Sequence, residues 1–167
     1  MTADPAAALP RFSPAVLAEY RELLARYPER RAALMPTLWL AQREFGWLSL
    51  DVQEYVAELM DLPLAWVTSV ASFYTMYWKE PKGRWHMQVC RNLSCALRGA
   101  TDIQRAIEAR LGIRDGERTP DGRFSLEEVE CLASCGTAPV LQLNNAEYHE
   151  RLDVARALAL IERLASE

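Results

Sequence analysis

Residues 90–95 read Cys-Arg-Asn-Leu-Ser-Cys, and residues 131–135 read Cys-Leu-Ala-Ser-Cys. Together they hold all four cysteines of the 167-residue chain. The first pair encloses four residues, the second pair encloses three, and 35 residues separate Cys95 from Cys131. Each pair follows an expected strand, so both pairs lie where a strand ends in a loop. Two such loops at one edge of a sheet can converge, and we therefore expect one site with four sulfur ligands.

Four thiolates suit a soft metal ion or an iron–sulfur cluster. Zinc is the main rival, but the commonest zinc knuckles enclose two residues in each half, and neither half here does. A thioredoxin-type dithiol would also need two enclosed residues. Four enclosed residues begin the plant-type ferredoxin pattern, although the remaining spacing differs from it. The spacing therefore favours a two-iron cluster, with zinc second and free thiols or disulfides as the remaining alternatives.

The residues around the cysteines favour a negatively charged ligand set. With Ser94 as the expected N-cap, Cys95 falls in the first turn of a helix, where free N–H groups stabilise a thiolate. Arg91 and Arg98 flank the same loop, and they either offset part of a cluster's charge or are simply solvated. Gly136 would let backbone amides approach sulfur closely.

The chain beyond residue 82 alternates strands and helices. We expect strands at 85–90 and 124–130, a helix at 94–111, a hairpin of 140–143 with 148–150, and a last helix after Asp153. The apolar phase of the second strand slips between Leu126 and Val129, which suggests a bulge. The resulting order is strand, helix, strand, strand, strand, helix.

The chain before residue 82 is expected to be helical. Helices are predicted after Ser13, over 30–45, after Ser49 and after Pro63. Pro36 either bends the second helix or marks its real start. In the fourth helix the apolar face is expected to hold the residues Trp66, Val67, Val70, Phe73 and Tyr74. Core packing is the simplest explanation of such a face, and any surplus aromatic side chains would form a docking surface.

The aromatic residues divide the chain in two. Of the 15 aromatic residues, 13 lie at or before Trp85, whereas all four cysteines lie after it. Turn residues at 81–83 mark the transition. We therefore expect a flexible tail at 1–12, a helical bundle at 13–82 and a second domain at 83–167.

Composition excludes several functions. No window approaches the roughly 20 apolar residues of a membrane-spanning helix, and no secretory signal begins the chain, so a cytoplasmic location is expected. A net charge of −4 with only two lysines argues against a nucleic-acid partner. The chain has no G-x-G-x-x-G and no Walker loop, so hydride chemistry must occur elsewhere.

The two histidines and an acidic run are expected to have no catalytic role. His86 and His149 are expected to be structural or on the surface, and Glu127, Glu128 and Glu130 to form a solvated strand edge.

Three stretches carry a resemblance to a known family. Residues 70–74 (Val-Ala-Ser-Phe-Tyr), 90–95 and 129–140 are similar to the thioredoxin-like two-iron ferredoxin subunits of respiratory complex I, NADH:quinone oxidoreductase. The similarity covers nearly the whole chain from about residue 13. It implies an α+β fold, in which an N-terminal helical bundle precedes a thioredoxin-like domain with a four-stranded sheet and two helices. It also implies that Cys90, Cys95, Cys131 and Cys135 hold one [2Fe-2S] cluster.

The resemblance further implies an electron-transfer subunit without a complete catalytic site of its own. FMN and NADH would be bound by a flavoprotein partner, with other peripheral-arm subunits nearby, and the chain would meet the cytoplasmic face of the membrane only through partners. Equivalent subunits of NAD-linked formate dehydrogenases or hydrogenases share these motifs, and a zinc-stapled docking scaffold is the alternative of another class. Ala133 departs from the family, which often has glycine there, so a positive φ would strain that loop.

Overall fold

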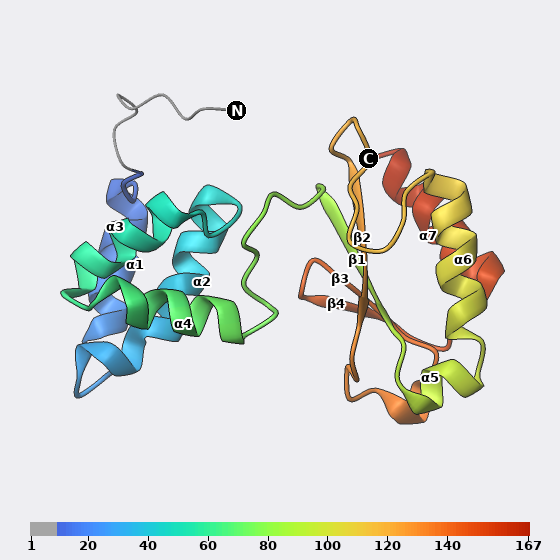
Figure 1. Cartoon of the computed structure of the whole chain (residues 1–167), viewed down its shortest axis with the longest axis horizontal. Coiled ribbons are helices and arrows are strands. Elements are labelled where there is room, and N and C mark those ends of the chain that lie inside the picture. Colours follow the sequence, from blue (N-terminus) through green and yellow to red (C-terminus); the bar gives the residue numbers. More distant parts are fainter. Residues whose placement is uncertain (1–9) are drawn as a thin grey trace. The chain divides into compact units, whose positions relative to one another are not determined.

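The computed structural model describes residues 10–167 (Figure 1). The chain divides into two compact units, the first ending at Pro81 and the second running from Lys82 to Glu167. Each unit has its own buried apolar residues: those of the first lie between Phe12 and Tyr77, and those of the second lie beyond Trp85. Within residues 10–167, no helix is long and apolar enough to cross a membrane.

The first unit is a bundle of short helices: α1 (Pro14–Leu24), a 3₁₀ turn η1 (Arg30–Ala33), α2 (Leu34–Phe45), α3 (Leu50–Met60) and α4 (Leu64–Phe73). Ser13 and Ser49 cap α1 and α3, because their hydroxyls accept the N–H groups of Val16 and Val52 at 3.4 and 3.2 Å. Pro36 lies in the first turn of α2, where its missing N–H costs no helical hydrogen bond. Of the two roles expected for Pro36, marking the helix start is therefore the right one.

Residues 1–12 were expected to form a flexible tail. Residues 1–9 lie outside the described part, and for Phe12 the expectation is wrong. Phe12 is buried, and its ring lies 5.8 Å from Phe45 and 5.2 Å from Tyr55, measured between ring centroids. Its N–H also donates to the Tyr55 hydroxyl at 3.1 Å. Aromatic packing therefore fixes the chain before α1 begins.

The expected apolar face of α4 was only partly right. Val67 and Ala71, one turn apart, are fully buried, whereas Trp66 and Phe73 keep 49% and 77% of their surface exposed. Tyr74, directly after α4, is also exposed. The helix turns its small side chains toward the core, so its large aromatic side chains form the surplus that the sequence left open as a docking surface.

The second unit is built on a four-stranded sheet in the order β2-β1-β3-β4. The strands are β1 (Trp85–Cys90), β2 (Phe124–Val129), β3 (Leu141–Leu143) and β4 (Glu147–His149). β1 is parallel to β2 and antiparallel to β3. Pairing of β1 with β2 is continuous from Trp85 opposite Phe124 to Cys90 opposite Val129, so the expected bulge is absent from this pair. The phase slip arises instead because β2 is an edge strand whose second half is only partly buried.

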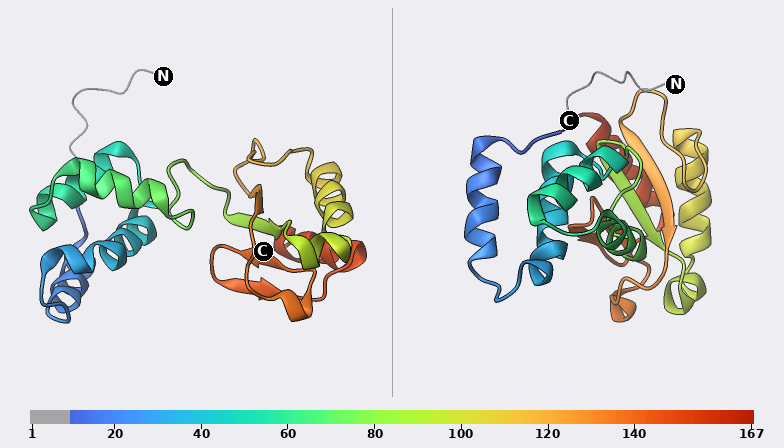
Figure 2. Two further views of the ribbon diagram at one scale, coloured as in Figure 1. Left: turned by 60° about the horizontal axis from the view of Figure 1, so that its bottom comes forward. Right: turned by 60° about the vertical axis from the view of Figure 1, so that its left-hand side comes forward.

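Three helices accompany the sheet: α5 (Leu93–Leu97), α6 (Ala100–Leu111) and α7 (Val154–Ala165). The single helix expected at 94–111 is wrong, because the chain breaks at Gly99, whose φ of +96° is left-handed. Asn92, not Ser94, caps α5. α6 and α7 cover one face of the sheet (Figures 1 and 2), and the Asp153 carboxylate caps α7 by accepting the Arg156 N–H at 2.8 Å.

Candidate iron–sulfur site

The two cysteine loops start at the same edge of the sheet. Because β1 and β2 are parallel, their carboxyl ends lie together, with Cys90 paired to Val129. From there the first loop leads into α5, which carries Cys95, and the second passes Cys131 to the short 3₁₀ helix η2 (Cys135–Thr137). α5 and η2 lie side by side at this end of the unit (Figure 1). The fold therefore brings all four predicted site residues to one place.

The four thiols form two pairs of different exposure. Cys90 and Cys95 are buried, whereas Cys131 and Cys135 are exposed, with 3.4 Å between their sulfur atoms. Burial raises the pKa of the Cys95 thiol to about 11, and its hydrogen bond with Cys90 acts in the same direction. The Cys131 thiol likewise raises the pKa of Cys135 above its ordinary value.

The pairs also act on one another. Cys135 contributes to the raised pKa of Cys95, and Cys90 contributes to that of Cys135. Clustered thiols resist ionisation because their negative charges would repel, so a bound metal must supply compensating positive charge. The four sulfur atoms therefore constitute one electrostatic group.

The donor set fits a two-iron cluster. Its two pairs enclose four and three residues, whereas the commonest zinc knuckles enclose two residues in each half. A structural zinc site needs four donors around one point, whereas a two-iron cluster takes one pair of thiolates on each side. Two thiol pairs, one buried and one exposed, match the second arrangement.

The first cysteine loop is held by polar contacts that sequence analysis missed. The Asn92 side-chain oxygen accepts the Leu93 N–H at 2.9 Å, and its Nδ2 donates to Glu130 at 2.9 Å. The Arg91 guanidinium donates to the same Glu130 carboxylate at 3.0 Å. Glu130 is therefore more than a solvated edge residue, and the charge of Arg91 is paired with it rather than free to face the sulfur atoms. An asparagine before a helix is a recognisable cap signal, but nothing local in the sequence indicates its contact with Glu130.

The second cysteine loop contains the predicted backbone strain. Ala133 has a φ of +62°, and its N–H donates to the Cys131 sulfur at 3.3 Å. Gly136, by contrast, has no positive φ, and a Cβ placed there would meet nothing within 4 Å. An amide approaches sulfur closely at Ala133, while the space beside Gly136 is open.

Comparison with known proteins assigns the chain to a family. Residues 20–165 match the family described as thioredoxin-like [2Fe-2S] ferredoxin. The chain belongs to this family. The resemblance seen in the sequence is confirmed, as is the fold class of a helical part followed by a thioredoxin-like domain.

Named relatives cover most of this ferredoxin. An NADH-quinone oxidoreductase subunit from Rhizobium meliloti (strain 1021) is 48% identical over 144 residues, which are 86% of this chain and 85% of the relative. NADH-quinone oxidoreductase subunit 2 from Thermus thermophilus is 46% identical over 142 residues, which are 84% of this chain and 78% of the relative.

Solved structures of an NAD+-reducing [NiFe]-hydrogenase are also similar. The air-oxidized state superposes with a TM-score of 0.70 at 25% identity over 80% of this chain. The H2-reduced state gives a TM-score of 0.69 over the same share. This ferredoxin spans 23% and 22% of the length of those two chains, so each contains a large part without a counterpart here.

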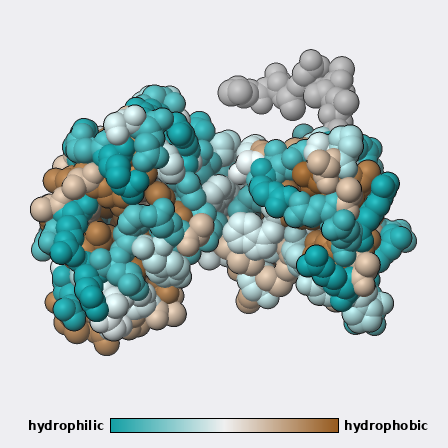
Figure 3. Space-filling view, turned by 180° about the vertical axis from the view of Figure 1, so that it is seen from behind, coloured by the Kyte–Doolittle hydropathy of each residue, from teal (hydrophilic) through white to brown (hydrophobic). Residues whose placement is uncertain are grey.

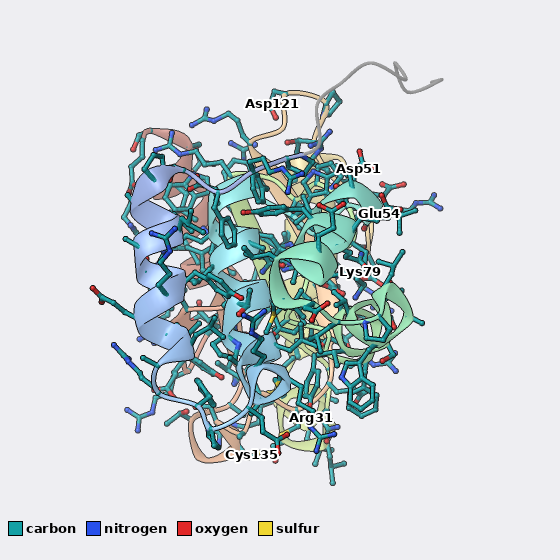
Figure 4. The ribbon with its side chains drawn as sticks, turned by 90° about the vertical axis from the view of Figure 1, so that its left-hand side faces the viewer. Arg31, Asp51, Glu54, Lys79, Asp121 and Cys135 are labelled. Atoms are coloured by element: carbon teal, nitrogen blue, oxygen red, sulfur yellow. The ribbon has the colours of Figure 1, made fainter. Side chains whose placement is uncertain are left out.

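The ferredoxin site opens on an apolar surface. Leu93 and Leu97, one turn apart on α5, keep 70% and 78% of their surface exposed. Apolar side chains gather at this end of the second unit (Figure 3), and Cys135 lies at the end opposite Asp121 (Figure 4). The exposed cysteine pair therefore lies at the surface, beside side chains that a partner could cover.

His86 lies away from the cysteines, at the other end of β1, and is fully buried. Its Nδ1 lies 2.8 Å from the Ser125 hydroxyl and its Nε2 lies 3.0 Å from the Glu127 carboxylate. These cross-strand contacts agree with the structural role expected for His86. They also show that Glu127 is a partner of His86 and not only part of a solvated edge.

Proposed function

We propose that this ferredoxin is the electron-transfer subunit of an NADH-quinone oxidoreductase, complex I, holding one [2Fe-2S] cluster on Cys90, Cys95, Cys131 and Cys135. The observation that carries the proposal is the convergence of two cysteine pairs at the carboxyl ends of two parallel strands. The choice of NADH-quinone oxidoreductase as the complex rests on the similar relatives, which are subunits of that enzyme.

The chain's own residues position and tune the site. When bound, the cluster supplies one-electron redox chemistry, which side chains cannot perform. Cys90 and Cys95 provide a buried pair of ligands, and Cys131 and Cys135 provide a pair at the surface, where a partner can approach. The Ala133 N–H donates to Cys131, which stabilises negative charge on that sulfur.

The partner proposed for electron exchange is a subunit that binds NADH and FMN. A reduced flavin carries two electrons, whereas the cluster takes one at a time. Electrons pass between the two cofactors only when these lie close together, so the subunits that hold them must meet. The exposed Leu93 and Leu97 beside the site suit such a contact, because interface cores are depleted of charge. Other peripheral-arm subunits would connect the chain to the cytoplasmic face of the membrane.

A subunit of an NAD-linked hydrogenase is the second candidate. It is favoured by the similarity to the NAD+-reducing [NiFe]-hydrogenase, in which the matching part lies within a much longer chain. The partner chain decides between the two candidates. Co-purification with a quinone-reductase arm supports complex I, and co-purification with a nickel subunit supports the hydrogenase.

The decisive experiment is anaerobic purification of the full chain with metal and sulfide analysis. We expect a brown protein with about two iron and two inorganic sulfide atoms per chain. Dithionite should produce an electron paramagnetic signal from a one-electron-reduced cluster. Stoichiometric zinc without visible absorption would overturn the proposal in favour of a zinc-stapled scaffold.

A further inference from the structure

Side chains from β4 and the residues just after it hold the second cysteine loop from outside. The Tyr148 hydroxyl donates to the carbonyl oxygen of Leu132 at 3.2 Å. The Thr137 hydroxyl donates to the Glu150 carboxylate at 2.7 Å, and the Ser134 hydroxyl donates to the same carboxylate oxygen. A short segment of chain thus fastens the loop at three points.

This loop depends on such contacts more than the first loop does. Cys90 lies in a strand and Cys95 in a helix, and both are buried. Cys131 and Cys135 are exposed, and the loop between them is irregular. Of its residues, Leu132 is the one that packs partly against a buried cluster. With so little apolar packing, the polar contacts supply most of what orders the exposed pair.

The Glu150 carboxylate contacts residues on both sides of Cys135 in the sequence. Ser134 directly precedes Cys135, and Thr137 lies two residues after it. One carboxylate oxygen therefore binds the chain on both sides of a proposed ligand. The Ser134 hydroxyl, followed by that of Thr137, lowers the pKa of Glu150, so the carboxylate is charged at neutral pH.

We propose that Glu150 is a positioning residue for the cluster: its carboxylate fixes Ser134 and Thr137, so that Cys135 is held ready to bind iron, and its charge lowers the reduction potential. This inference rests on the proposed function, since it presumes a cluster at the four cysteines. The charge effect follows because a nearby negative group opposes the addition of an electron. Glu150 does not itself bind iron.

The test compares iron release and reduction potential in full-length variants. Glu150→Ala removes hydrogen bonds to a charged acceptor, which stabilise the loop more than neutral ones do. We therefore expect this variant to lose iron to a chelator roughly 10-fold faster than wild type. Glu150→Gln keeps an acceptor for both hydroxyls, so its iron loss should be slower than that of Glu150→Ala. Both variants remove the charge and should raise the reduction potential equally, which a purely structural role would not do.

Ser134→Ala and Glu147→Gln complete the design. Ser134→Ala removes a donor to Glu150 and should also speed iron loss, while the double variant Ser134→Ala/Glu150→Ala should lose iron more slowly than the product of the two single effects predicts. Glu147 begins β4, three residues before Glu150; it is exposed and pairs with His149, so Glu147→Gln should behave as wild type.

Wild-type iron loss and an unchanged potential in Glu150→Ala would overturn the inference, as would fully multiplicative effects in the double variant. A wild-type chain that never assembles a cluster would instead overturn the proposed function, so the two failures can be told apart.

Discussion

The backbone N–H of Ala133 donates to the sulfur of Cys131 at 3.3 Å, from a residue whose φ is +62°. The left-handed turn folds the loop back onto its own first cysteine. An L-residue with a Cβ pays roughly 1–2 kcal/mol for this conformation, which glycine adopts freely. The loop therefore keeps a strained residue at the point where an amide meets a proposed ligand.

Ala133→Gly should relieve this strain. Part of the gain is lost because glycine is more flexible in the unfolded chain, so we expect a net stabilisation of about 0.5–1 kcal/mol. The thermal midpoint of the second unit should rise by about 2–8 °C, the range for a domain of its size. Ala146→Gly is the matched control, at an exposed turn residue without positive φ, and should not stabilise. A lower midpoint for Ala133→Gly than for wild type would contradict the role of backbone strain.

Replacing any of the four cysteines by alanine should abolish or severely destabilise the cluster. In the proposed cluster each thiolate supplies one of the four protein bonds to iron, and this chain has no fifth cysteine to substitute. Iron content and visible absorption after anaerobic purification report the outcome. Arg98→Ala, an exposed residue just after α5, is the control and should keep full iron. Full iron in one of the alanine variants would remove that cysteine from the ligand set.

Tyr77 should make the stability of the first unit sensitive to alkaline pH. It is fully buried, its hydroxyl donates to the Met35 carbonyl at 2.8 Å, and burial raises its pKa to about 12. The folded state therefore favours the neutral phenol. This contribution is complete below the unfolded pKa of about 10 and is lost as the pH rises toward 12.

Unfolding of the full chain, followed by far-ultraviolet circular dichroism between pH 9 and 12, measures this effect. Burial also raises the pKa of Tyr20, so the two tyrosines act together. Tyr77→Phe should be less stable than wild type at pH 9, because the Met35 contact is lost, but its decline toward pH 12 should be shallower. An equal slope in both proteins would show that Tyr77 is not the titrating group.

Local patterns predicted most of the elements, and long-range contacts explain what they missed. Cap residues act over three or four positions, which is why the starts of α1 and α3 could be predicted from the sequence. The helix at 94–111 failed because its apolar spacing continues across Gly99, and only the structure shows the chain turning there.

The ligand candidates could be found from spacing, but their supports could not. Cysteines are rare and chemically distinct, so two pairs after two strands already indicate a site. Glu130 and Glu150 look like ordinary surface carboxylates until the fold brings them to Asn92 and Ser134, which lie 38 and 16 residues away. The exposure of Phe73 was hidden for a similar reason, since helical spacing does not say which of two apolar faces meets the core.

A fragment starting at Lys82 should still assemble the cluster. All four cysteines and every described strand lie beyond that point, and Trp85 packs against the apolar core of its own unit. Separate cores are what allow parts of a chain to fold alone. Iron content of the purified fragment is the measurement. An aggregated fragment without iron would show instead that the two units need each other to fold.

The same fragment should bind the flavoprotein poorly, because the removed unit carries the exposed aromatic side chains. Trp66 and Phe73 lie on α4 with 49% and 77% of their surface exposed, and buried aromatic anchors dominate binding energy at interfaces.

In the full chain, Trp66→Ser and Phe73→Ser should therefore each weaken flavoprotein binding by roughly 10-fold or more. Tyr27→Ser is the matched control, since Tyr27 is an exposed aromatic residue of the same unit that lies outside α4. Titration of the purified flavoprotein with each variant gives the affinities, with iron content checked in parallel. Undiminished affinity of the cluster-loaded fragment would refute a docking role for the helical unit and leave the surface around Leu93 and Leu97 as the contact.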